Sequence, residues 1–199
     1  MLRLAYLLCS FSLRCASVQA QNLIQNPDFD SDFTAWNTPF SGNTIDNADG
    51  SPSAPSAQFS TVRFGDGSGL SFVDQCVSLI GFPPPWTFGA RVRVVSSTGT
   101  SCQIYVFASF DTGTCAARAI NSGIGALASG TVSGTQGDFT QYAITISDPM
   151  PAGSPSQAAD LIIEASCPTS GDSMTINFDH AYLGTSGTTP VRLQSFYVE

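Results

Sequence analysis

The feature that most constrains the fold is a strict alternation of apolar and polar residues in short runs. In one run Trp86, Phe88 and Val92 share a face, while Arg91 and Arg93 lie on the other. A period of two places successive side chains on opposite sides of the backbone, which is typical of a half-buried strand. Clusters of Gly, Pro, Ser and Thr separate the runs, as turns would. The four clearest runs are residues 86–95, 103–110, 141–147 and 161–167.

Weaker patterns predict further strands near residues 23–29, 56–60, 70–79 and 175–183. About eight short strands with turn signals between them indicate an all-β protein of two antiparallel sheets, a β-sandwich or jelly roll. The one stretch with some helical character, residues 115–128, becomes rich in Gly and Ser towards its end, and we predict a loop there.

The N-terminus has the pattern of a secretory signal peptide. A basic start is followed by a mostly apolar run of ten residues at 4–13, and Val18 and Ala20 stand at positions −3 and −1 of a cleavage site. We therefore predict a signal peptide over 1–20, a β-sandwich domain over 21–184, and a linker and tail over 185–199. No later segment is apolar enough to insert into a membrane. The expected location is secreted, either extracellular or periplasmic.

The composition excludes several functions. The chain has 15 acidic and 7 basic residues, all seven of them arginine, and a net charge of −8. Nucleic-acid binding needs a cationic surface, so it is excluded. Catalysis has little support, because His180 is the only histidine and no G-x-S-x-G serine motif occurs. We predict that the protein is not an enzyme.

Four cysteines remain after the signal peptide, and an even number in an exported chain indicates two disulfides. Cys102 and Cys167 continue the inward phase of their strands, whereas Cys76 points outward and Cys115 lies in the predicted loop. This favours the pairs Cys102–Cys167 and Cys76–Cys115. The alternative, Cys102–Cys115 with Cys76–Cys167, stays open at this point.

Four short motifs follow one another along the chain. They are NLIQNPDFD at 22–30 with Phe33 and Trp36 after it, QCV at 75–77, WTF at 86–88 and NFDHAYL at 177–183. In this order they resemble the carbohydrate-binding modules of the family 4/9/22 type, which are galactose-binding-like jelly rolls. The resemblance spans residues 22–184, with Pro27, Asp30 and His180 departing from the family pattern.

The resemblance implies a structural calcium ion held by Asp30 and Asp179 together with backbone carbonyls. Calcium prefers six to eight oxygen ligands of this kind. The residues add a separate hint, because the apolar phase moves from Phe178 to Ala181 and Leu183, which is the signature of a β-bulge next to Asp179. The alternative is that both aspartates only accept hydrogen bonds from loop amides at a strand end.

Sugar binding requires an exposed aromatic ring and planar polar groups that reach hydroxyls. Five outward side chains of three strands are the candidates, on the expectation that 86–95, 103–110 and 161–167 share one sheet. They are Arg91, Arg93, Tyr105, Phe107 and Glu164. The alternative is that a loop within 111–138 covers this face. Trp86 shares the inward phase of its strand and is expected in the core, and Trp36 is expected to pack at the rim.

These observations predict a secreted, non-catalytic domain similar to carbohydrate-binding modules, which binds glycan or polysaccharide on an outward sheet face. The alternative function is a structural or adhesion β-sandwich of the cell surface or extracellular matrix that binds no sugar. Fold class does not decide between the two.

Overall fold

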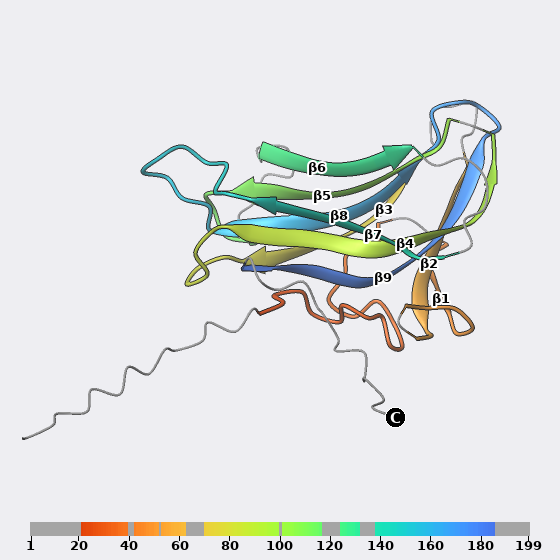
Figure 1. Cartoon of the computed structure of the whole chain (residues 1–199), viewed down its shortest axis with the longest axis horizontal. Coiled ribbons are helices and arrows are strands. Elements are labelled where there is room, and N and C mark those ends of the chain that lie inside the picture. The colour runs from red at the N-terminus through yellow and green to blue at the C-terminus, as the bar shows by residue number, and fades with distance from the viewer. Residues whose placement is uncertain are drawn as a thin grey trace, which may run out of the picture.

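In the computed structural model the described residues form nine strands, which make two antiparallel sheets (Figure 1). The structure describes residues 21–39, 42–51, 53–62, 70–99, 101–116, 124–131 and 138–185. The strands are β1 (Thr44–Asp46), β2 (Ser56–Val62), β3 (Leu70–Ser78), β4 (Trp86–Thr98), β5 (Gln103–Asp111), β6 (Ile124–Thr131), β7 (Thr140–Ile146), β8 (Ala158–Ser166) and β9 (Ser173–Thr185). Among the described residues we find no helix with the length and apolarity needed to cross a membrane.

The two sheets lie face to face as a β-sandwich of jelly-roll type. One has five strands in the order β1-β2-β9-β4-β7, and the other has four in the order β3-β8-β5-β6. The four clearest alternating runs of the sequence form β4, β5, β7 and β8. The predicted all-β fold is therefore confirmed. Strands β4, β5 and β8 each contribute one apolar face to the space between the sheets, because side chains alternate along a strand.

The alternation predicts the core correctly. Along β5 the inward residues Ile104, Val106, Ala108 and Phe110 are all at most 1% exposed. Trp86, at the start of β4, is buried as expected and stacks on Phe110 with ring centroids 5.3 Å apart. This contact joins the two sheets at one end of the sandwich.

An aromatic cluster closes the core beneath the N-terminal segment. The ring of Phe178 in β9 lies 4.9 Å from that of Phe29 and 5.1 Å from that of Phe59. Trp36 in turn lies 4.9 Å from Phe29 and is buried. The second tryptophan is therefore also a packing residue, as predicted.

The strand expected over 23–29 is wrong. This segment makes a single bridge to β9, between Asn22 and Gly184. Asn26 and Phe29 have positive φ values of 47° and 49°, and Pro27 between them has no N–H to donate, so the backbone cannot stay extended.

The side chain of a buried glutamine, rather than a paired strand, holds the N-terminal segment. The side-chain oxygen of Gln75 accepts the backbone N–H of Gln25 at 2.7 Å, and its amide nitrogen donates to the backbone oxygen of Gln25 at 2.9 Å. Gln75 thus acts as a short stretch of backbone that pairs with the segment. This explains why a polar residue occupies an inward position of β3.

Two other expectations need correction at their boundaries. The predicted loop over 115–128 contains the first part of β6, which pairs with β5 along its length. Its small residues hide the alternation, because glycine and alanine give no clear apolar face. The predicted linker begins one residue too early, since Thr185 is the last residue of β9, and β1 was not predicted.

The disulfides join Cys76 to Cys115 and Cys102 to Cys167. The favoured pairing is therefore confirmed and the alternative is wrong. Cys102 and Cys167 are fully buried, as their inward phase predicted. Disulfides of this kind persist in oxidising compartments, which fits an extracellular protein.

The bulge predicted in the closing strand is present. Gly89 of β4 faces Tyr182, and Arg91 faces Asp179, so one residue of β4 lies opposite two of β9. His180 takes up the extra length with a φ of 51°. The expectations for residues 1–20 and 186–199 fall outside the described residues and stay predictions.

Replacing Phe178 by Ala should remove the centre of the aromatic cluster. We expect a loss of about 3–5 kcal/mol in the free energy of unfolding, as for other buried Phe→Ala changes. Urea denaturation of the variant and the wild type measures it, and the exposed Ile80→Ala change, within about 0.5 kcal/mol of wild type, is the control. A loss below about 1 kcal/mol would contradict the central role of this ring.

Candidate functional site

The outward face of the four-stranded sheet brings an aromatic and a carboxylate residue together. Tyr105 in β5 lies directly opposite Glu164 in β8, and Phe72 in β3 lies opposite Glu164 on its other side. Residues opposite each other in antiparallel strands share a face, with Cβ atoms about 4.5–5.5 Å apart. Phe72, Glu164 and Tyr105 therefore form one row across three strands.

A second row runs beside the first. Phe107 lies opposite Ile162, and Ile162 lies opposite Asp74. Phe107 and Ile162 are half-buried, whereas Asp74 is 4% exposed and accepts a hydrogen bond from the Asn37 side chain at 2.8 Å. The two rows together form a partly apolar surface with carboxylates within it. We call the four-stranded sheet sheet B and this surface the sheet-B face. It is defined by Phe72, Tyr105, Phe107, Ile162 and Glu164.

Three of the five predicted sugar-binding residues lie on the sheet-B face. Tyr105, Phe107 and Glu164 are all half-buried, and the Tyr105 hydroxyl donates a hydrogen bond to the side-chain oxygen of Gln103. Burial raises the pKa of the Glu164 carboxyl above its usual value. Tyr105 and Glu164 are paired across β5 and β8, so one face carries both a hydroxyl and a carboxyl, the types of polar group that orient a ligand.

Phe72 and Ile162 were missed by the sequence reasoning. Both lie in the outward phase of their strands, one position away from inward residues that were recognised. An aromatic residue in the outward phase of the 70–79 run was the available signal. It was overlooked because the inward residues Val73 and Val77 defined that run.

The other two predicted residues, Arg91 and Arg93, do not belong to this surface. They lie on β4, which pairs with β7 and β9 in the five-stranded sheet. The expectation that all three strands share one sheet is therefore wrong. The physical reason is that β4 and β5, although consecutive, cross from one sheet to the other, and pairing between distant strands is invisible to a local alternation.

The two arginines hold a loop instead. Arg93 forms an ion pair with Asp49 at 2.6 Å, and Asp49 also accepts the buried Asn177 amide at 2.8 Å. Arg91 donates to the Ser51 hydroxyl at 2.8 Å. Segment 46–51 is thereby fastened to the outward face of the five-stranded sheet.

Asp179, one of the two predicted calcium ligands, is buried beneath this loop. It is 1% exposed, and its two oxygens accept the backbone N–H groups of Ser51 and His180, both at 2.7 Å. Burial is the main cause that raises the pKa of this carboxyl to about 7, and the nearby Asp28 carboxylate adds to it, against the two hydrogen bonds. The second predicted ligand, Asp30, is exposed.

Asp28 contacts the bulge directly. Its carboxylate contacts the Nδ1 atom of His180 at 2.7 Å, and the backbone oxygen of Pro27 accepts the N–H of Ala181 at 2.9 Å. The N-terminal segment is thus tied to β9 by a side chain and by backbone. In the described part of the chain, no group of three or more His, Cys, Asp or Glu side chains is placed to hold a metal ion.

Comparison with known proteins yields matches in structure only. No family model and no curated protein sequence matches the chain. A family 61 carbohydrate-binding module in complex with β-1,4-galactotriose superposes with a TM-score of 0.52 at 13% identity, covering 83% of this chain and 99% of the module. A family 16 carbohydrate-binding module gives 0.52 at 17% identity, covering 81% and 99%.

A third structure is the CBM22-2 xylan-binding domain of Xyn10C from Paenibacillus barcinonensis. It gives a TM-score of 0.50 at 13% identity and covers 80% of this chain and 98% of that domain. At such identities the likeness concerns the fold alone. The fold is that of jelly-roll carbohydrate-binding modules, as the sequence motifs predicted.

The raised pKa of Asp179 predicts a pH dependence of stability. The unfolded carboxyl ionises near its ordinary pKa of 3.8 and the folded one near 7, so the folded chain binds more protons between these values. Stability from this group must therefore fall as the pH rises from about 4 to 7. Asp179→Asn should remove this fall.

Urea unfolding of both proteins from about pH 4 to 8, with EDTA present, measures the effect. The free energy of unfolding of wild type minus that of Asp179→Asn should decrease with rising pH. Parallel profiles would contradict the raised pKa.

Proposed function

We propose that this protein is a secreted, non-catalytic carbohydrate-binding domain, which binds glycan or polysaccharide on the sheet-B face. The observation that carries the proposal is the row Phe72–Glu164–Tyr105 beside Phe107, exposed in part on the outward face of a jelly-roll sheet. An aromatic ring can pack against the apolar face of a pyranose, and Glu164 and Tyr105 can bind its hydroxyls.

If the residues of the sheet-B face only packed under a loop, we would expect a different set of side chains there. A row that only packs under a loop would need no ionisable group, because burying a carboxyl disfavours its charged form. Glu164 lies between two aromatic residues and its pKa is raised by that burial. A ligand hydroxyl that hydrogen-bonds this carboxyl would compensate its desolvation.

Lack of catalysis is supported by the surroundings of the one histidine. His180 lies in the bulge of β9, where its ring contacts Asp28, on the other sheet from Tyr105 and Glu164. The jelly-roll neighbours in the structure comparison include isolated binding modules. Secretion is supported by the two disulfides and by the signal-peptide pattern of residues 1–20.

The double change Tyr105→Ala and Phe107→Ala tests the binding face. Residues 21–199 are applied to a broad glycan array and to insoluble polysaccharides. We expect binding by wild type and at least a tenfold weaker binding by the double variant, because truncated aromatic anchors of an interface commonly cost about 2 kcal/mol or more. Arg91→Ala, on the other sheet, is the control and should bind as wild type does.

Two outcomes would count against the proposal. Binding that survives in the double variant would move the site away from the sheet-B face. No binding to any glycan would favour the structural or adhesion domain.

We also propose that calcium stabilises the protein at Asp179, with Asp30 and backbone carbonyls as further ligands. The support is the buried carboxylate of Asp179, whose raised pKa reflects the cost of burying its charge, a cost that a cation would offset. Asp179 fits calcium as an oxygen donor. Backbone carbonyls would have to supply most of the remaining six to eight oxygens, because Asp30 is exposed.

Thermal unfolding in excess calcium and in EDTA tests this site. Ligand binding to the folded state alone raises the melting temperature, so calcium should raise that of wild type and leave that of Asp179→Ala unchanged. Asp138→Ala, an exposed acidic residue elsewhere, is the matched control and should respond as wild type does. An equal rise in Asp179→Ala would exclude Asp179 as a ligand.

A further inference from the structure

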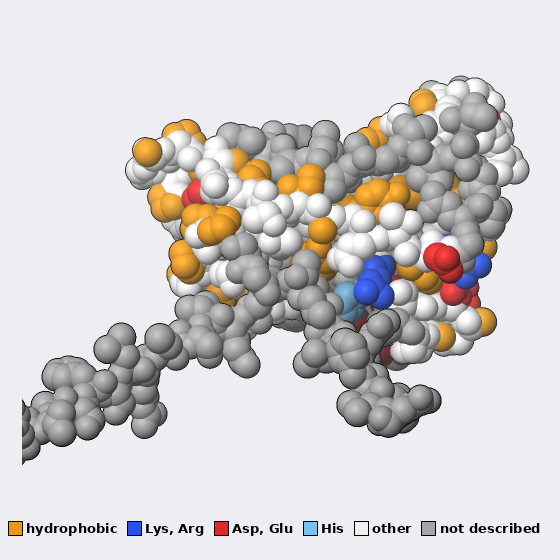
Figure 2. All heavy atoms as spheres, in the orientation of Figure 1, with side chains coloured by type: hydrophobic (Ala, Val, Ile, Leu, Met, Phe, Trp, Pro, Cys, Tyr) orange, Lys and Arg blue, Asp and Glu red, His pale blue; other side chains and the backbone are white. Residues whose placement is uncertain are grey.

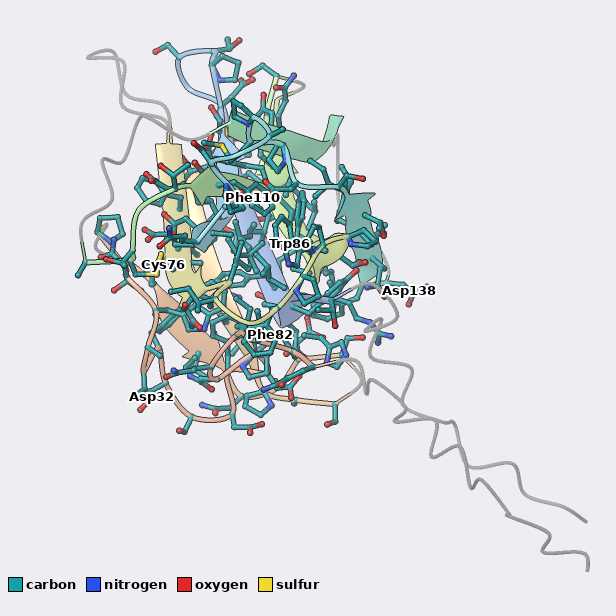
Figure 3. All side chains as sticks on the ribbon, turned by 90° about the vertical axis from the view of Figure 1, so that its left-hand side faces the viewer. Asp32, Cys76, Phe82, Trp86, Phe110 and Asp138 are labelled. Carbon is teal, nitrogen blue, oxygen red and sulfur yellow. A yellow bond between two sulfur atoms is a disulfide. The ribbon has the colours of Figure 1, made fainter. Side chains whose placement is uncertain are left out.

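One end of the sandwich carries a cleft that the proposed glycan site does not use. The loops that join β3 to β4 and β7 to β8 flank it, and its volume is about 560 Å³. Figure 3 faces this end and shows Phe82 close to Trp86. Figure 2 shows hydrophobic side chains gathered at the same end, on the left of the view.

The walls of the cleft are apolar and bear several rings. Phe82, Pro84, Trp86 and Pro155 line it together with Ile80. Ile80 is 63% exposed and is the one large hydrophobic residue so exposed among the described residues. Single exposed apolar residues are common, but this one borders a concave surface of a size that takes small ligands.

A carboxylate lies in this apolar surface. One oxygen of Asp148 accepts the Met150 N–H at 3.0 Å and the Ser156 hydroxyl at 2.7 Å, and the other accepts the Ser156 N–H at 3.0 Å. Burial alone would raise the pKa of Asp148, but these hydrogen bonds outweigh it and lower the pKa. Asp148 is therefore ionised at neutral pH. Since a carboxylate offers about four acceptor positions, one remains for a ligand.

The remaining polar groups decide the kind of ligand. None of the described residues that line the cleft is Lys, Arg or His, so an anion finds no cationic side chain there. The Ser156 hydroxyl already donates to Asp148, which leaves the Gln157 amide as the side-chain donor of the lining. A sugar hydroxyl needs both donors and acceptors, whereas an ammonium group needs acceptors only.

We propose that this cleft binds a small organic cation, a primary ammonium group carried on an apolar or aromatic body. The ammonium group donates to Asp148, and the body packs against Phe82, Ile80 and the proline rings. The net charge of −8 attracts such a ligand. The proposal is independent of glycan binding, because the sheet-B face shares no residue with this cleft.

The test compares two probes of the same shape, 2-phenylethylammonium and the neutral 2-phenylethanol. NMR titration of the full chain at neutral pH and low salt reads the two indole N–H signals. Trp86 lines the cleft and donates to the Phe82 carbonyl, whereas Trp36 donates to Asn26 within the N-terminal segment. We expect the Trp86 signal to shift and the Trp36 signal to stay.

The ammonium probe should bind about tenfold more tightly than the alcohol, because a charge-assisted hydrogen bond is about twice as strong as a neutral one. The difference should shrink at high salt. Equal affinity of the two probes, or no shift of the Trp86 signal by the ammonium probe, would overturn the proposal.

Two variants of one exposed residue separate charge from shape. Ile80→Lys places a cation at the rim without touching the hydrogen bonds of Asp148, and Ile80→Gln is the neutral control. The lysine variant should bind the ammonium probe several-fold more weakly than the glutamine variant, while both bind the alcohol equally. An equal affinity of both variants for the ammonium probe would contradict an electrostatic site.

Asp148→Asn should abolish the preference for the ammonium probe over the alcohol. A preference that persists in this variant would exclude Asp148 as the partner.

Discussion

The pairing of β9 with β2 and β4 organises most of this protein. Phe178 projects from β9 into the core, where it meets Phe29 and Phe59, so one ring joins the N-terminal segment to the sandwich. Its neighbours Asn177 and Asp179 hold segment 46–51 by hydrogen bonds on the opposite face. Without the bulge at His180, Asp179 and Ala181 would point to the same side of β9. The bulge lets the buried, polar Asp179 point to the outward face while the apolar Ala181 points into the core.

The main free-energy cost of this arrangement is the burial of the Asp179 carboxylate. A buried carboxylate needs compensation, and here two backbone N–H groups supply it in part. The five-stranded sheet thus uses its outward face to hold the chain together. Its arginines Arg91 and Arg93 donate hydrogen bonds to Ser51 and Asp49. The sheet-B face differs because three of its five residues, Phe72, Tyr105 and Phe107, are aromatic.

Binding surfaces of a sandwich lie either on a sheet face or at an end where loops meet. The sheet-B face is built from the neighbouring strands β3, β8 and β5, and aromatic side chains provide much of its surface. The end cleft lies between two loops, and residues of both loops line it. Its single carboxylate and apolar walls favour a charged ligand with an apolar body, whereas the sheet-B face offers rings beside hydroxyl and carboxyl groups.

What the sequence by itself determined is the inward or outward direction of each side chain within a strand. The alternation of two is a local property of the backbone, so it placed Trp86 and Phe110 in the core, favoured the cysteine pairing that forms and located the bulge beside Asp179. It failed where local signals were absent, in the small residues of β6 and in the turns at Asn26 and Phe29.

Only the tertiary structure decided which strands share a sheet and which loops share an end. Arg93 and Tyr105 both point outward, yet they lie on different sheets because β4 pairs with β9 and β5 pairs with β8. Likewise Phe82 and Asp148 meet at one cleft although 65 residues separate them in the chain. Hydrogen bonding between distant strands sets these neighbours, and no periodicity along the chain encodes it.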